Sequence, residues 1–349
     1  MSCNRALKPG MNAKRVLNAR SVAVASAASN GGDDETNNNN PFSTSTSSNA
    51  SSSAISAAAS LTVDEFIRSG DVVAVGPGEL PAAVLSELAK RLESGELGSI
   101  RVVAAGDAPA AEAAVAGVPQ VKQQSKSTEE NDATTPDVAI LQADEVDRAD
   151  LSFIACRHDD GFGASSSSSS SNSSGALPQP QLARVAAAAS ASKRGTVSLV
   201  ASPLLLVDRL TGDVPVAVEL ELMEDGSGGD WEEAAEELDD EFLGDASLGV
   251  WRRPSASGIP RSHPRGGDNP HAEVTVQGGV TLLDVRFGEG NALSLLGDAG
   301  AKYEDVLMTI EGVPGVVGCG LFTGPGVAGV VVVGGGEDGS SPKVMRRPA

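Results

Sequence analysis

The stretch that decides the fold is SGDVVAVGPGELPAAVLSELAKRLESGELGSIRVVAA, residues 69–105. It opens with an apolar strand over 71–75, turns at a Gly-Pro-Gly triplet, and continues with helical apolar spacing over 80–97. A second apolar strand over 100–104 follows. A strand, a helix and another strand in this order form a βαβ unit, so the segment predicts parallel strands covered by a helix.

The same alternation continues further along the chain. The expected elements are helices over 108–116 and 182–192 and strands over 137–141 and 196–201. This series predicts an α/β fold with a doubly wound, Rossmann-like parallel sheet.

After Gly212 the pattern changes to alternating strands and an acidic helix. The expected elements are a strand over 214–220, a helix over 231–243, a hairpin over 274–287 around Gly278-Gly279, a helix over 303–310, and two short strands within 315–333. Their β-α-β-β-α-β order predicts an inserted ferredoxin-like α+β domain. The last strand, Val330 to Val333, is expected to return to the first sheet.

The N-terminus has a composition of its own. The first 30 residues contain five basic residues and no acidic one, and most of the rest are small or hydroxylated. Such a basic, Ser- and Ala-rich segment is typical of an organelle transit peptide, and its weak amphipathicity favours the chloroplast stroma over the mitochondrion. The alternative is a disordered N-terminus without a targeting role.

These patterns predict a division of the chain into segments. A capping-box pattern at Thr62 and Glu65 predicts that order begins near Leu61. The predicted segments are a transit peptide over 1–30, a disordered linker over 31–60, a Rossmann-like domain over 61–212 plus 320–334, an α+β lid domain over 213–319, and a flexible tail over 335–349.

Composition excludes several classes of partner. The formal net charge of −21 disfavours nucleic acid and anionic membrane surfaces, and no apolar run of about 18 residues is present to span a bilayer. Cys3, Cys156 and Cys319 are far apart and lack CxxC or Cys/His spacing, which argues against a disulfide framework and a structural zinc site.

The C-terminal segments carry a family resemblance. GVTLLDVRF (279–287), IEGVPGVVGCGLF (310–322) and VVVVG (330–334) resemble the C-terminal signature of ribose-5-phosphate isomerase A. Weaker matches precede them in the same order: residues 69–78, 143–147, 206–210 and 214–218. The resemblance therefore covers residues 61–334, most of the chain after the predicted linker.

The resemblance implies a function and a mechanism. The family interconverts ribose 5-phosphate and ribulose 5-phosphate without a metal or cofactor. A glutamate moves a proton between two sugar carbons through an enediolate, a lysine and aspartates stabilise the oxyanion, and hydroxyl-rich loops hold the phosphate. For this chain it implies a sugar phosphate as ligand, no cofactor, and assembly into a homo-oligomer or a hetero-oligomer with isomerase subunits.

Gly76 and Gly78 match the family's phosphate-binding turn. Between and after them, Pro77, Glu79 and Leu80 replace hydroxyl residues. Proline has no N–H to donate, and a carboxylate repels a phosphate by about 1 kcal/mol in water. The turn is consequently either a reduced phosphate cradle or a purely structural strand-to-helix turn.

Asp144 is the one catalytic-type residue that the resemblance retains; the alternative is a solvated loop carboxylate. Arg157 is a candidate for the missing cation. The remaining family positions fall on residues of other chemistry: Leu141 at the first aspartate, Arg184 at the general base, Leu205 at the lysine, and Ala105 with Gly106 at a second hydroxyl pair.

Three functions remain open. The first is an active plastid isomerase of the pentose-phosphate pathway. The second is a non-catalytic isomerase-like paralogue that binds a partner such as active isomerase subunits. The third is an isomerase-like enzyme with another substrate. The third lacks any new nucleophile, metal cluster or base in the sequence. The residues favour the second, because a general base and oxyanion stabilisation are both missing.

We expect residues 1–60, fused ahead of a fluorescent protein, to carry it into the chloroplast, because import signals of this type are basic and acid-poor. A matched fusion with the five basic residues of 1–30 changed to glutamine should stay in the cytosol. Cytosolic fluorescence from the unchanged fusion would contradict the prediction.

Overall fold

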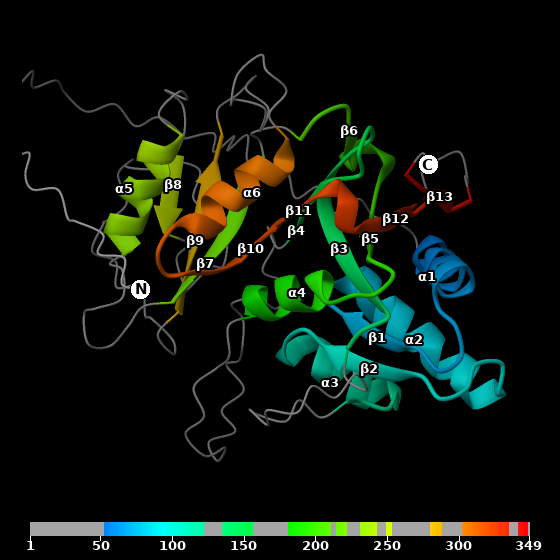
Figure 1. The fold of residues 1–349 in the computed structure, drawn as a ribbon. Helices are drawn as coiled ribbons and strands as arrows, with labels where there is room; N and C mark the ends of the chain where they lie inside the picture. The colour runs from blue at the N-terminus through cyan, green and yellow to red at the C-terminus, as the bar shows by residue number, and fades with distance from the viewer. Residues whose placement is uncertain are drawn as a thin grey trace, which may run out of the picture. The chain divides into compact units, whose positions relative to one another are not determined.

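The computed structural model describes residues 52–121, 135–155, 181–210, 214–221, 231–242, 249–252, 280–287, 302–334 and 341–347. These residues form a nine-stranded sheet and a four-stranded sheet, with helices against both (Figure 1). The predicted transit peptide, Arg157 and the Gly278-Gly279 turn lie outside the described residues.

The centre of the larger sheet is parallel. Its strands, in spatial order, are β2 (Arg101–Ala104), β1 (Val72–Val75), β3 (Val138–Asp147), β5 (Thr196–Val200) and β12 (Val327–Val332). They are built largely from valine, alanine and leucine, and most of their side chains are buried. Continuous apolar strands of this kind are expected where both faces of a parallel sheet are covered.

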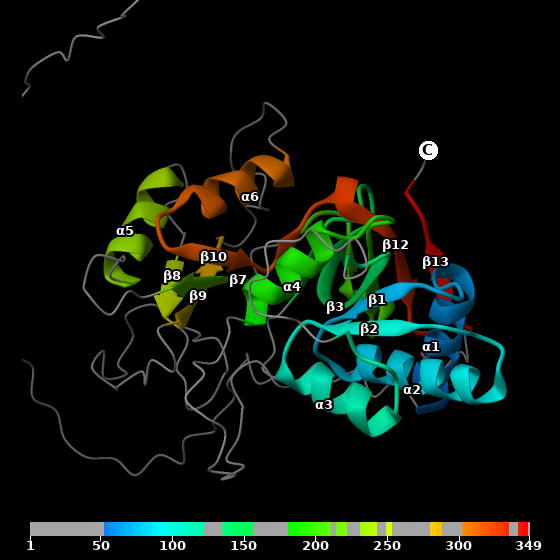
Figure 2. The ribbon, with the colours of Figure 1, turned by 60° about the horizontal axis from the view of Figure 1, so that its bottom comes forward.

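Helices cover the two faces of this sheet. The apolar sides of α1 (Ser52–Phe66), α2 (Glu79–Ser94) and α3 (Asp107–Ala116) pack into one core, and α4 (Gln181–Ser190) packs into the core on the opposite face. Figure 2 shows α2 and α3 on one side of β1 and β2, with α4 on the other. The predicted doubly wound α/β fold is confirmed.

Short strands extend the larger sheet. The C-terminal half of β3 pairs with β4 (Phe153–Ala155) and with β6 (Leu206–Val207), and β11 (Leu321–Phe322) pairs with β4. At the far edge, β13 (Lys343–Met345) pairs antiparallel with β12. Residues 343–345 form this strand within the segment 335–349, for which the sequence predicts a flexible tail.

The smaller sheet is antiparallel, in the order β10-β7-β9-β8. Its strands are β7 (Val216–Glu221), β8 (Gly249–Arg252), β9 (Val280–Arg286) and β10 (Val316–Cys319), and its helices are α5 (Trp231–Glu241) and α6 (Tyr303–Gly312). The element order is β-α-β-β-α-β, but its second strand is β8, at 249–252, where the sequence predicted no element. The first part of the predicted hairpin, 274–279, lies outside the described residues. Both helices pack with the sheet in a third core.

The first helix differs from the prediction. It starts at Ser52, within the stretch expected to be linker, and Ala58 and Ala59 are buried in the core. Thr62 does not cap this helix, because it lies inside it and its hydroxyl donates to the Ala58 carbonyl at 2.7 Å. Alanine-rich sequence has high helix propensity, and burial against the sheet stabilises it. In the part of the chain that is described, no helix is both long and apolar enough to cross a membrane.

A buried tyrosine connects the two sheets. The Tyr303 hydroxyl, on α6, donates to Asp147 Oδ2 at 2.7 Å and accepts from the Leu210 amide at 3.0 Å. Asp147 ends β3, and its other oxygen accepts from the Ala149 amide at 2.7 Å. Burial, together with the bond to Asp147, raises the pKa of the Tyr303 hydroxyl above its usual range. The tyrosine therefore stays protonated and donates across the full neutral range of pH.

We expect Tyr303→Phe to lower the free energy of unfolding by about 1–3 kcal/mol, because the change leaves the Asp147 carboxylate and the Leu210 amide without a buried partner. Denaturant titration measures the difference. Met308→Ala, at an exposed position on the same helix, is the matched control and should change stability by about 0.5 kcal/mol or less. Equal effects of the two substitutions would show that the hydroxyl contributes nothing.

Candidate functional site

The candidate site lies at the carboxyl ends of the parallel strands, where ligands bind in doubly wound folds. There β1 leads through Gly76–Gly78 into α2, and β2 leads through Ala105 and Gly106 into α3. The backbone amides in the first turn of each helix point toward this edge, and such N–H groups can donate hydrogen bonds to an anion. The side chains beside these amides determine whether an anion can bind there.

The two glycines of the first turn lie close to side chains of β3. A Cβ at Gly76 would lie 2.6 Å from Leu141 Cδ2, and one at Gly78 would lie 2.5 Å from Gln142 Oε1. Gly78 also has a φ of 124°, a backbone conformation that other residues rarely adopt. Glycine at these two positions leaves room for two large side chains of β3. This favours a purely structural strand-to-helix turn over a phosphate-binding turn.

Gln142 fills the position where an anion would bind at α2. The Leu80 amide, in the first turn of α2, donates to Gln142 Oε1 at 3.1 Å. A neutral amide oxygen of the chain itself therefore satisfies a helix N-terminal donor. Glu79, exposed in the same turn, adds a carboxylate to this helix end.

The N-termini of α3 and α4 also have acceptors of the protein beside them. Asp107 occupies the first turn of α3. At α4, the Ala183 amide donates to Glu219 Oε2 at 2.7 Å, and the Glu219 side chain comes from β7 and is only 5% exposed. Carboxylates at helix N-termini interact favourably with the helix dipole and exclude other anions.

Arg184, at the expected base position, holds α4 against the edge of the sheet. Its Nη1 is 3.3 Å from Asp107 Oδ1, and its Nη2 donates to the Ala104 carbonyl at 3.3 Å. The side chain is 19% exposed, and Nε is buried without a hydrogen-bond partner. An arginine remains protonated at any relevant pH, so it cannot accept the proton that isomerisation requires.

Asp144 lies on β3 and is half-buried, at an irregularity in the pairing with β4. It is therefore at the same sheet edge as Gly76, Gly78 and Gln142. Leu205, at the expected lysine position, belongs to the short 3-10 helix Pro203–Leu205 and packs against the apolar core. Within the described ranges, no group of three or more His, Cys, Asp or Glu side chains is arranged to hold a metal ion.

Sequence reasoning missed Gln142 and Glu219. Gln142 was a visible signal, because it is a polar residue inside the otherwise apolar run 138–143. Glu219 interrupts the apolar alternation of 214–220 less obviously, since an outward-facing carboxylate is usual in a half-exposed strand. Their partners, Leu80 and Ala183, are distant in sequence, so spacing alone could not identify them.

Comparison with known proteins places the fold. No protein-family model and no curated protein matches the chain. Solved structures do: ribose 5-phosphate isomerase from Plasmodium falciparum has 18% identity and a TM-score of 0.58, with 85% of this chain and 99% of that chain covered. A D-ribose-5-phosphate isomerase in complex with phospho-erythronic acid has 22% identity and a TM-score of 0.57, covering 84% and 98%.

The ribose 5-phosphate isomerase A of Methanocaldococcus jannaschii has 18% identity and a TM-score of 0.55, covering 84% of this chain and 99% of that chain. The chain therefore has the fold of ribose 5-phosphate isomerase A over essentially the whole length of these enzymes. At this level of identity, the function depends on the site and not on the fold.

We expect Gln142→Ala to lower the free energy of unfolding by about 0.5–2 kcal/mol, the range for losing a helix N-terminal acceptor. It should also free the Leu80 amide. Inorganic phosphate should then raise the unfolding temperature of the variant more than that of the unchanged protein. Gln142→Glu, which keeps an acceptor of the same length, is the matched control and should show no such phosphate response. An identical phosphate response in all three proteins would rule out Gln142 as the occupant of this helix end.

Proposed function

We propose that this chain is a non-catalytic protein with the fold of ribose 5-phosphate isomerase A, which acts as a binding or regulatory subunit. The observation that carries the proposal is the Gln142 side chain at the N-terminus of α2, bonded to the Leu80 amide. In the family resembled by the sequence, the turn before this helix holds the substrate phosphate. Here the turn faces Leu141 and Gln142 instead.

The charges support the same conclusion. A phosphate dianion brought to this edge would meet Glu79 and Asp107, both exposed in the first turns of their helices. Among the described residues at this edge, Arg184 is a cation, and its guanidinium is bonded to Asp107 and the Ala104 carbonyl. Binding a phosphate would require these contacts to break first.

The residues that catalyse isomerisation are missing as well as those that bind the phosphate. Isomerisation needs a carboxylate base and a cation or fixed donors for the enediolate oxygen. Arg184 stands at the base position and Leu205 at the lysine position. Replacing one of these residues would not restore a reaction that requires both together with an open phosphate site.

A second candidate, a ribose 5-phosphate isomerase of low turnover, is supported by Asp144. This carboxylate is retained from the family motif and lies half-buried at the sheet edge where the family has its site. The substrate would be a sugar phosphate, without a cofactor. For either candidate we propose the chloroplast stroma as the location and isomerase subunits, identical or different, as the assembly partners.

An activity assay decides between the candidates. We expect the purified full-length chain to isomerise ribose 5-phosphate at least about 100-fold more slowly than an established isomerase measured beside it, because loss of the general base alone costs about 10²–10⁴-fold. Arg184→Glu should not restore turnover, since the lysine and phosphate sites are still missing.

Turnover within tenfold of the reference enzyme would refute the non-catalytic proposal. In that case Asp144→Asn should abolish the activity, while Asp208→Asn, with a side chain that is 96% exposed, should leave it unchanged. Co-expression with an active isomerase, followed by size-exclusion chromatography, tests the proposed role as a subunit: the two chains should elute together.

A further inference from the structure

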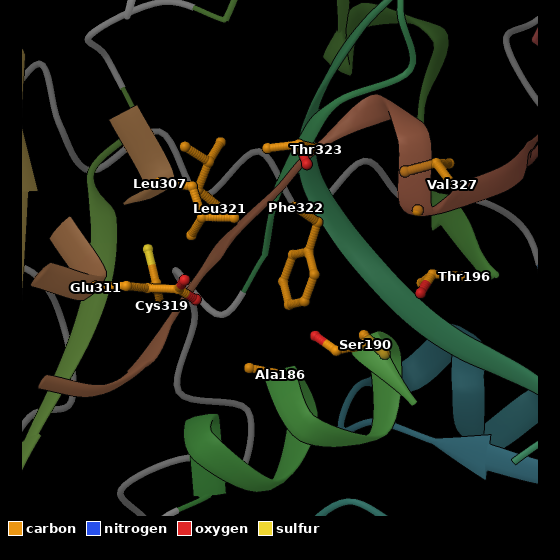
Figure 3. A pocket seen from close by; sticks show the side chains of 12 residues that line it. Ala186, Ser190, Thr196, Leu307, Glu311, Cys319, Leu321, Phe322, Thr323 and Val327 are labelled. Carbon is orange, nitrogen blue, oxygen red and sulfur yellow. The ribbon is translucent and has the colours of Figure 1, made fainter. Parts of the chain in front are cut away.

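A second concave site lies at the opposite end of α4 from Arg184. It is a pocket of about 100 Å³ between α4, α6 and the segment from β10 to the start of β12 (Figure 3). Ser190 is the last residue of α4, and Thr196 and Val327 are the first residues of their strands. The pocket therefore opens at the amino ends of the parallel strands, away from the site described above.

Small residues on α4 create the space. Ala186 and Ala189 face the pocket where larger side chains would fill it. Across from them, Leu307 and Glu311 of α6 are four residues apart and so project from one side of the helix. Figure 3 shows the Phe322 ring reaching into the space between Leu321 and Ala186. That ring is held in place by stacking on Phe153, with centroids 4.8 Å apart.

The lining has one sign of charge. Among the described residues that line the pocket, Glu311 is the one carboxylate, and none is lysine, arginine or histidine. Hydroxyl groups of Ser190, Thr196 and Thr323 provide further acceptors. The Cys319 thiol is neutral near pH 7, because burial raises its pKa to about 12. Among these described lining residues, a ligand with a negative charge would find no cation, whereas a positive charge would find the Glu311 carboxylate.

We propose that this pocket binds a small organic cation, a primary ammonium group on a short apolar chain. The ammonium group would lie at the rim against Glu311, while the chain would contact Ala186, Leu321 and Phe322. By proportion with a cavity of about 150 Å³ that holds the six carbons of benzene, the pocket takes about four non-hydrogen atoms, which is a four-carbon chain with its ammonium group at the rim. A bound ligand would bridge α4 and α6 and so stabilise the contact between the two sheets.

Titration of the full-length chain with butylammonium, followed by calorimetry or ligand-observed NMR, tests the proposal. We expect saturable binding of butylammonium, weaker binding of butanol at equal ionic strength, and no binding of butyrate. Glu311→Gln should weaken butylammonium binding about three- to fivefold, the contribution of a solvent-exposed ion pair, and leave butanol binding unchanged. Ala186→Leu should abolish both by filling the pocket.

Glu304→Gln is the matched control, because Glu304 lies on the same helix but not in the pocket lining. It should leave butylammonium affinity unchanged. An equal loss in Glu304→Gln and Glu311→Gln would show general attraction to an acidic protein and overturn the proposal, as would equal affinities for all three ligands or no saturable binding. The ligand series uses the unchanged protein, so it remains decisive if Ala186→Leu does not fold. The result does not depend on whether the chain isomerises sugar phosphates.

Discussion

The close approach of β3 to the turn after β1 is the contact on which the rest of the candidate site depends. Gly76 and Gly78 have no side chains, and the space is taken by Leu141 and Gln142. The same glycines that would let a phosphate approach the backbone here let the protein's own side chains approach it. The fold keeps its tight turn, and the helix donor at Leu80 is satisfied from within the chain.

The charged side chains around this edge are also bonded to other parts of the chain. Glu219 accepts from the start of α4, and Arg184 connects α4 with the start of α3 through Asp107. These contacts join α4 to β7 and to the start of α3, so they stabilise the packing of α4 on the sheet.

Low identity with a shared fold has a simple physical origin. The apolar strands and the helix faces that cover them need only hydrophobic residues of suitable volume, a condition that many sequences meet. Structures with 18–22% identity can therefore match over 84–85% of this chain. Residues at the carboxyl ends of the strands contribute little to that core. They can change chemistry without changing the fold, so function has to be argued from them separately.

The sequence by itself determined the alternation of strands and helices and the parallel core, because hydrophobic periodicity is a local property. It also placed both glycines of the turn. It did not predict β8, at 249–252. Only the tertiary structure decided that Ser52 to Leu61 is helical and that 343–345 form a strand, since burial against distant elements stabilises them. The role of Gln142 was likewise undetermined. Its partner Leu80 is 62 residues away, and no local pattern encodes a contact between residues brought together only by folding.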